Sequence, residues 1–338
     1  MAAAAQDRVK TDTVNNRKHP DTVMSTETLP VIDIADLASE ATRRAIDAAC
    51  RDWGFFQAVG HGINERTIAA LKHEMRAFFA QPLEAKRAIV RTAENPWGFY
   101  DQELTRRTRD WKQIYDYGPP DGGALHPQWP WALPGFRAAV EAFYAACDAV
   151  ALRLLHVVAL NLGMTETALD GAFRPAHTSF LRLNFYPRCP RPERPEQSVV
   201  AKTGFLGVNH HTDSGALTLL LQDEQPGLEV LHDGSWHLVE PRRDALVVNI
   251  GDIVQVWSND RYRAALHRGL VAADVERFSA PFFFNPAYSA AYAPLPSTID
   301  ERHPASYRPI LWQEFRARRA AGDYADHGEY AQISDYRR

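Results

Sequence analysis

The sequence predicts a mainly β fold with flanking α-helices, in which a mainly helical N-terminal half is followed by a sandwich or barrel. Two observations carry this prediction. Up to about residue 176, apolar residues recur mostly at helical spacing. After that point, short β-rich runs separated by turn signals follow one another at roughly 8–12-residue intervals, which is typical of sandwiches and barrels rather than parallel α/β sheets.

Length and composition narrow the classes of function. The chain has 338 residues, 45% of them hydrophobic, so it can bury a sizeable core. Lys plus Arg number 38 against 42 Asp plus Glu, a net charge of −4, which argues against a nucleic-acid or polybasic membrane partner. No uninterrupted apolar run approaches the roughly 18 residues of a membrane span. We expect a monomer or weak homo-oligomer that acts on a small molecule.

The cysteines indicate the compartment. Cys50, Cys147 and Cys189 lie far apart and form no CxxC pair, so neither a disulfide framework nor a zinc site is expected. A reducing, cytoplasmic setting fits this usage. Residues 1–28 form a polar segment with Asp7 and Asp12, typical of a mobile tail rather than a signal or transit peptide.

Residues 29–176 are expected to form a mainly helical region. A short apolar run at 29–34 suits a strand. Gly163 stands just past the longest helical pattern, where a left-handed cap belongs. The apolar residues at helical spacing are Ile46, Ala49, Cys50 and Trp53; Ile68, Leu71, Met75, Phe78 and Phe79; and Phe136, Val140, Phe143, Cys147, Val150, Leu154 and Val158.

Residues 177–290 are expected to form the β core. Asp233–Gly234 marks a hairpin between two of its runs, and the proline-rich stretch 187–197 must be a loop because proline removes ladder donors. Residues 291–338 form a C-terminal segment with a terminal helix in LWQEFRARRAAG. The expected strands lie within 179–186, 205–211, 216–222, 228–232, 236–239, 245–250, 253–257, 265–272 and 278–284.

The candidate metal site lies in VNHHTDSGALTLLLQ. Side chains alternate along an extended backbone, so His211 and Asp213 project to one face, about 7 Å apart. His267, on a later strand, would supply a third ligand. Two histidines and one carboxylate on one face of an octahedron leave three positions open, which is the facial triad of non-haem Fe(II) oxygenases.

Three other histidines compete for the same role. Alternation disfavours His210, which projects to the opposite face from His211. His232 and His237 flank the predicted turn and are expected at a solvated edge.

The order of motifs resembles a known family, the isopenicillin N synthase-like branch of the Fe(II)/2-oxoglutarate-dependent dioxygenases. The similarity covers nearly the whole chain after residue 28. It implies a double-stranded β-helix, or jelly roll, with N-terminal helices packed around it. The motifs that carry it are LPVIDI, DWGFFQAVGHGI, LRLNFYPRCP, HTDSGALTLLLQD, GLEVL, NIGDIVQVWSND, LHR and RFSAPFFFNP.

The resemblance implies iron ligation by His211, Asp213 and His267, and it assigns further residues to the cosubstrate. Arg277 and Ser279 match the R-x-S motif that binds the distal carboxylate of 2-oxoglutarate, and Asn184 and Tyr186 match the N-x-Y positions beside it. Arginine suits a carboxylate because its planar fork donates two parallel hydrogen bonds. Arg182, on the same strand face, is a further candidate for the pocket wall.

The implied reaction couples oxidative decarboxylation of 2-oxoglutarate by dioxygen to hydroxylation of a small substrate, with desaturation or ring closure as variants. Ascorbate is the expected reductant. Two alternatives are an isopenicillin N synthase-like or ascorbate-using oxidase without 2-oxoglutarate, and an inactive jelly-roll binding protein. A cupin-like hydrolase or isomerase is disfavoured because it would not need Arg277 and Ser279. Candidates for an aromatic substrate lining are Tyr100, Tyr115, Tyr117 and Phe283.

Overall fold

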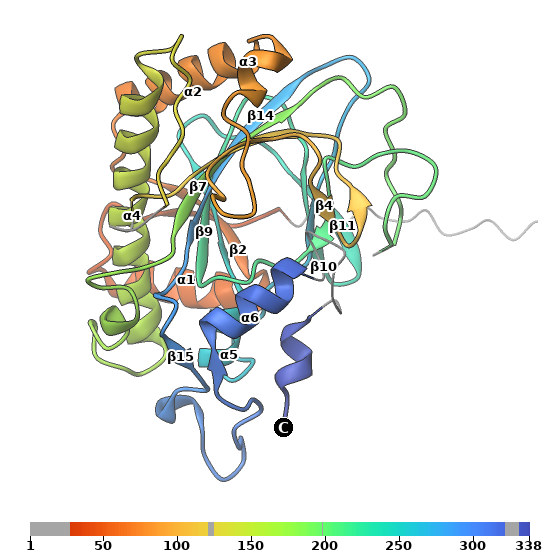
Figure 1. Cartoon of the computed structure of the whole chain (residues 1–338). Helices are drawn as coiled ribbons and strands as arrows, with labels where there is room; N and C mark the ends of the chain where they lie inside the picture. The colour runs from red at the N-terminus through yellow and green to blue at the C-terminus, as the bar shows by residue number, and fades with distance from the viewer. Residues whose placement is uncertain (1–27, 121–124, 198, 322–330) are drawn as a thin grey trace, which may run out of the picture.

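The computed structural model describes residues 28–120, 125–197, 199–321 and 331–338. The predicted tail at 1–28 lies outside these residues except for its last position. Two sheets form the centre of the molecule, and helices α2 (Glu65–Phe79) and α4 (Phe136–Asn161) cover one side of it (Figure 1).

The larger sheet has eight strands in the order β1-β2-β12-β9-β14-β7-β6-β3. Its centre pairs β14 antiparallel with both β7 and β9, which places Arg277 opposite Tyr186 and Ser279 opposite Asn184. The strands are β1 (Val31–Asp33), β2 (Phe55–Val59), β3 (Gly98–Tyr100), β6 (Gln113–Tyr117), β7 (Phe180–Tyr186), β9 (Leu217–Gln222), β12 (Leu246–Ile250) and β14 (Arg277–Phe284).

The smaller sheet has four strands in the order β11-β10-β13-β8. The β13–β8 pair sets His267 directly opposite His211, and the β10–β11 hairpin turns at Asp233–Gly234, both with positive φ, as the sequence predicts. Its strands are β8 (Val208–His211), β10 (Leu228–His232), β11 (Ser235–Val239) and β13 (His267–Gly269). The two sheets form the jelly roll.

Helices cover the outer face of the larger sheet. The longest, α4 (Phe136–Asn161), packs on β7, β9 and β14 and against α1 and α2, with Gly163 in the predicted left-handed conformation after its end. By length and composition it could cross a membrane, but 56% of its most apolar window is buried in the fold, as in a core helix. The other long helices are α1 (Glu40–Asp52) and α2 (Glu65–Phe79), with the short α3 (Leu83–Arg87) after them.

The region 29–176 contributes more than helices. Strands β1, β2, β3 and β6 come from it and extend the larger sheet at both edges. β2 and β6 are buried on both faces, whereas β1 buries only Ile32. A small hairpin of β4 (Leu104–Thr105) and β5 (Thr108–Arg109) also belongs to it. The C-terminal segment holds the β15–β16 pair (Ala291–Tyr292, Ile310–Leu311) and the expected terminal helix α6 (Trp312–Arg319).

The expected strand at 253–257 is wrong, since Asp252–Trp257 forms the short helix α5. Its β-branched residues lower helix propensity by less than about 0.7 kcal/mol each. The helix buries Ile253, Val254, Val256 and Trp257, and burial of such a side chain contributes roughly 1.5–3 kcal/mol. Tertiary packing therefore outweighs the local preference.

Candidate metal centre and active-site pocket

Three side chains converge between the two sheets. His211 ends β8, His267 begins β13, and Asp213 follows β8 by two residues. Asp213 Oδ1 lies 3.6 Å from His211 Nε2 and 3.5 Å from His267 Nε2. One donor atom from each residue lies within 4.8 Å of the other two. The structure thus brings together the three residues that alternation and the family motif predict.

Each member of the triad is held by a second group. The Nδ1 atoms of His211 and His267 lie 2.8 and 3.1 Å from the carbonyl oxygens of Asn209 and Ala265. A ring that donates its Nδ1 proton to a carbonyl leaves Nε2 unprotonated, and Nε2 is the nitrogen that faces Asp213 in both histidines. Such outer partners fix the tautomer and orientation of metal ligands.

Asp213 is oriented in the same way. Its Oδ2 accepts hydrogen bonds from Thr218 Oγ1 at 2.5 Å and Asn249 Nδ2 at 2.8 Å, which leaves Oδ1 directed at the histidines. Burial alone would raise the pKa of Asp213, but the two imidazoles and the hydrogen bonds hold this pKa well below its usual range. The carboxylate is therefore ionised, as a metal ligand must be.

The competing histidines lie elsewhere. His210 is buried on the opposite face of β8. His232 was expected at a solvated edge, and that expectation is wrong. Its ring is only 7% exposed and stacks on Trp53 with centroids 3.9 Å apart, while His237 meets the same indole edge-on.

A pocket between the sheets contains the triad and all four residues expected near the cosubstrate. Asn184 Nδ2 donates to Ser279 Oγ at 3.2 Å across the β7–β14 pair. The guanidinium of Arg277 lies 4.1 Å above the ring of Tyr186. All four side chains are nearly inaccessible to solvent.

The donor set fits Fe(II) and a dicarboxylate. Two imidazoles and one carboxylate, with room left on the pocket side, match the ligands of non-haem iron oxygenases. Arg277 is 6% exposed, its Nε has no hydrogen-bond acceptor, and it forms no salt bridge with a carboxylate of the described residues. Asp223 is near enough to interact with Arg277 electrostatically but forms no ion pair with it. A buried guanidinium without a directly bound anion is costly, so this guanidinium fits the distal carboxylate of 2-oxoglutarate.

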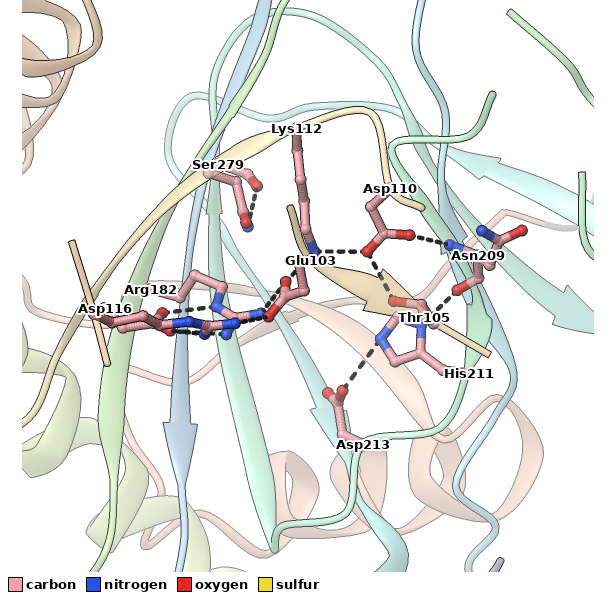
Figure 2. Close-up of polar contacts among 12 residues, drawn as sticks. Glu103, Thr105, Asp110, Lys112, Asp116, Arg182, Asn209, His211, Asp213 and Ser279 are labelled. Atoms are coloured by element: carbon pink, nitrogen blue, oxygen red, sulfur yellow. Dashed lines mark hydrogen bonds and ion pairs between the residues drawn. The ribbon is translucent and has the colours of Figure 1, made fainter. Parts of the chain in front are cut away.

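A buried ionic network forms one side of this pocket, and we call it the polar wall (Figure 2). Lys112 Nζ lies 2.8 Å from Glu103 Oε2 and 3.1 Å from Asp110 Oδ2. Arg182 bridges Glu103 and Asp116, with both contacts at 2.7 Å. Lys112 and Arg182 themselves line the pocket.

The charges of the polar wall stabilise one another. Burial raises the pKa of Glu103, but the cations of Arg182 and Lys112 outweigh it and hold that pKa well below its usual range. Asp110 differs, because burial raises its pKa to about 6 in spite of Lys112. The wall therefore offers N–H donors to the pocket, and its carboxylates are occupied by internal partners.

Only one of the four residues expected to line a substrate site does so. Phe283 lines the pocket. Tyr115 and Tyr117 do not: they point from β6 into the core, where Tyr115 donates to Gln128 O at 2.6 Å and Tyr117 packs on Tyr144. Tyr100 lies beneath Arg91, outside the pocket.

The reason for this correction is the alternation of side chains along β6. Because successive side chains of a strand point to opposite faces, Tyr115 and Tyr117 point toward the helices, whereas Asp116 points toward Arg182. Lys112, just before β6, was missed although it lies only three residues before the candidate Tyr115. Thr218 and Asn249 were missed too, since nothing in a strand pattern marks a residue as a partner of Asp213.

The comparisons with known proteins agree with this geometry. Residues 177–286 match the 2OG-Fe(II) oxygenase superfamily, and residues 29–132 match the N-terminal region of non-haem dioxygenases in morphine synthesis. Jasmonate-induced oxygenase 2 of Arabidopsis thaliana is 32% identical over 299 residues, covering 85% of this chain and 78% of that protein. Flavanone 3-dioxygenase 2 of Oryza sativa subsp. japonica is 33% identical over 319 residues, covering 89% and 86%.

Solved structures show the same fold with ligands bound. The crystal structure of JOX2 in complex with 2OG, Fe, and JA has a TM-score of 0.78 and 29% identity, covering 91% of this chain and 88% of that one. The crystal structure of a full-length Neurospora crassa protein in complex with alpha-KG and thymine has a TM-score of 0.76 and 25% identity, covering 87% and 96%. The chain belongs to the 2OG-Fe(II) oxygenase superfamily and is a non-haem Fe(II)- and 2-oxoglutarate-dependent dioxygenase.

Proposed function

We propose that His211, Asp213 and His267 ligate Fe(II), and that Arg277 and Ser279 bind the distal carboxylate of 2-oxoglutarate with support from Asn184 and Tyr186. One observation carries this proposal above the others. The triad and the buried guanidinium of Arg277, whose Nε has no hydrogen-bond acceptor, line the same pocket, although they come from different strands.

Each residue then has a definite task. When bound, Fe(II) and 2-oxoglutarate activate dioxygen to oxidise a substrate C–H bond, with succinate and carbon dioxide as the other products. The triad occupies one face of the metal and leaves the pocket face open. Thr218 and Asn249 keep Asp213 Oδ1 directed at the metal position. Apolar side chains such as Leu220 and Phe283 exclude water from the reacting groups.

The polar wall supports a proposal for the chemical class of the primary substrate. Lys112 has three N–H donors, and two of them meet Glu103 and Asp110, so one remains for the pocket that Lys112 lines. We propose a small organic substrate that presents an oxygen acceptor, such as a carbonyl or carboxylate, to this wall. Two relatives named as a flavanone 3-dioxygenase and a gibberellin 20 oxidase support this class, as does the solved structure of JOX2 in complex with JA.

Net charge and cysteine usage support proposals for the partners and the cellular compartment of the protein. The net charge of −4 supports a protein without nucleic-acid or membrane partners, and the three buried free cysteines support a reducing, cytoplasmic compartment. We propose a monomer or weak homo-oligomer, with ascorbate as the reductant that keeps iron in the ferrous state.

Anaerobic titration of Fe(II) and then 2-oxoglutarate tests the binding roles, and succinate release against jasmonate, a flavanone, a gibberellin and thymine tests the substrate class. We expect 2-oxoglutarate to bind only with metal present, and succinate release to rise with a carbonyl- or carboxylate-bearing compound. Product formation that continues undiminished without 2-oxoglutarate would instead support the isopenicillin N synthase-like alternative. A substrate whose turnover is unchanged in Lys112→Met would refute the role of the polar wall.

A further inference from the structure

The positive and negative charges of the polar wall are equal in number. Lys112 and Arg182 each contact two of its carboxylates (Figure 2). Arg91 adds a third cation, with its guanidinium 3.1 Å from Asp116 Oδ2 and 3.5 Å from Glu103 Oε1. Within the described residues, the charged members of the wall are therefore three cations and three carboxylates: Arg91, Lys112 and Arg182, and Glu103, Asp110 and Asp116.

The carboxylates of the wall are sealed from solvent and lie behind its cations. The side chains of Glu103 and Asp116 are 3% and 4% exposed, and that of Asp110 is fully buried. Of these charged groups, Lys112 and Arg182 are the ones that line the pocket. Burial raises the pKa of Asp110 to about 6, so above this pH its carboxylate is ionised and the balance is complete. The wall thus presents N–H donors to the pocket without an excess of positive charge.

The other cations that line the pocket are also accounted for. Arg268 Nε lies 2.7 Å from Oε2 of the fully buried Glu229. Arg194 contacts the same carboxylate from the solvent side, with its side chain 59% exposed. Arg277 is the remaining lysine or arginine among the described residues that line the pocket, and the proposed function assigns it to 2-oxoglutarate. Asp223, which interacts with Arg277 electrostatically, adds no positive charge.

The charges around the metal position cancel once the cosubstrate is in place. Fe(II) and Arg277 together carry three positive charges, and Asp213 and 2-oxoglutarate together carry three negative ones. The pocket that receives the primary substrate then has no unpaired cation to offer to an anion.

This balance affects carboxylates and carbonyls differently. A carboxylate that leaves water for a buried site loses its hydration, and only an uncompensated cation repays that cost. A carbonyl oxygen needs only a hydrogen-bond donor, because the group itself carries no charge. Lys112 has such a donor, since two of its three N–H groups meet Glu103 and Asp110.

We propose that the charge-balanced polar wall selects an uncharged primary substrate, a small organic compound that presents a ketone, lactone or amide carbonyl to Lys112 rather than a carboxylate. This inference rests on the proposed function and narrows its substrate class. Lys112 and the carboxylates behind it are then the groups that determine specificity.

The test compares probes that differ in charge but hardly in shape, namely a carboxylate and the primary carboxamide of the same skeleton. The pairs are phenylacetate and phenylacetamide, cinnamate and cinnamamide, and jasmonate and its primary amide. Each probe is added anaerobically at pH 8 to protein that holds Fe(II) and saturating 2-oxoglutarate, so that carboxylate probes do not take the place of the cosubstrate. Paramagnetic broadening of the proton NMR signals of the probe measures its binding near the iron.

Wild type should bind the amide roughly tenfold or more tighter than the carboxylate on every skeleton that binds, because the buried carboxylate finds no unpaired cation. A carboxylate that binds as tightly as its amide, or tighter, would overturn the proposal. Absence of binding by all three amides would overturn it as well.

A change of charge in the wall tests the cause of the preference. Asp110→Asn removes one negative charge with little change of shape and leaves Lys112 with Glu103 as its carboxylate partner, so the preference for the amide should fall roughly tenfold. Asp244→Asn is the matched control, because it makes the same change at a surface ion pair with Arg242, 3.2 Å away, and it should keep the wild-type preference. An unchanged preference in Asp110→Asn would rule out charge balance as the cause.

Glu103→Gln serves as a second variant should Asp110→Asn fail to fold, with folding checked by near-UV circular dichroism. Its expected result is the same, since it also removes one negative charge from the wall. The outcome for the proposed function is read separately. Failure of wild type to bind 2-oxoglutarate in the presence of Fe(II) would refute that function, whereas equal affinities for amide and carboxylate would refute only the selection by charge.

Discussion

A single methyl group at Gly227 should weaken 2-oxoglutarate binding without touching the metal. An added Cβ would lie 2.6 Å from Nε, 2.9 Å from Cδ and 3.0 Å from Cζ of Arg277. Gly227 does not have positive φ, so its backbone accepts alanine, and the effect of the substitution is confined to the displaced side chain. Arg277 cannot retreat, because Tyr186 is stacked at 4.1 Å.

The size of the effect follows from the cost of overpacking. Inserting a methyl group into a filled site costs about 1–3 kcal/mol. If the whole of this energy opposes the guanidinium position that binds 2-oxoglutarate, the dissociation constant of 2-oxoglutarate rises by about 5- to 150-fold. Affinity for Fe(II) should not change, because the three atoms nearest to the added Cβ all belong to Arg277 and none to the triad.

Calorimetric titration of Fe(II), and then of 2-oxoglutarate under anaerobic conditions, separates the two affinities. Gly171→Ala is the matched control, since a Cβ there meets no atom within 4 Å and Gly171 also lacks positive φ. An unchanged 2-oxoglutarate affinity in Gly227→Ala would refute the argument that Arg277 is held in a fixed place. A parallel loss of Fe(II) affinity would point to general unfolding.

Three further predictions concern the metal centre and the polar wall. Alanine at any triad position should abolish Fe(II) binding with little loss of fold, whereas His210→Ala should retain it; metal analysis after desalting checks both. Asn249→Ala removes one of the two hydrogen bonds to Asp213 and should weaken Fe(II) binding about 10–100-fold, and an unaltered affinity would remove this support role. The folded-state pKa of Asp110, raised from 3.8 to about 6, means that the folded state binds more protons than the unfolded state in this range. Its stabilisation is therefore present at low pH and is lost as pH rises through about 4–6, by about 3 kcal/mol. The melting temperature of Asp110→Asn relative to wild type should thus be higher at pH 8 than at pH 4, and a pH-independent difference would contradict the shift.

The sequence predicts the metal ligands because chemistry limits the choices. Few residue types bind iron, and the alternation of a strand separates His211 and Asp213 from His210. The cosubstrate residues followed from the family motif and from the i, i+2 spacing of Arg277 and Ser279, which keeps both on one strand face.

What the sequence could not predict depends on contacts between distant segments. The polar wall joins Glu103 to Arg182, 79 residues away, and no local pattern records such a pairing. The prediction that Tyr115 lines the substrate site is wrong because its strand is buried on both faces. The sequence of such a strand does not indicate which of its two faces lines the pocket. The prediction of a strand at 253–257 is wrong for a similar reason. Whether this segment forms a helix or a strand depends on the burial of Val254 and Trp257 in the folded protein.

The central claim is that this pocket holds iron and 2-oxoglutarate together and uses dioxygen. The most direct measurement is incubation of Fe(II)-loaded protein with 2-oxoglutarate under ¹⁸O₂, followed by mass spectrometry of the succinate formed in slow turnover without primary substrate. We predict succinate that carries one ¹⁸O atom, its formation lost in Asp213→Ala and in Arg277→Ala at low 2-oxoglutarate concentration. Succinate without label, or undiminished turnover with Zn(II) in place of Fe(II), would contradict the account, because zinc has no redox chemistry.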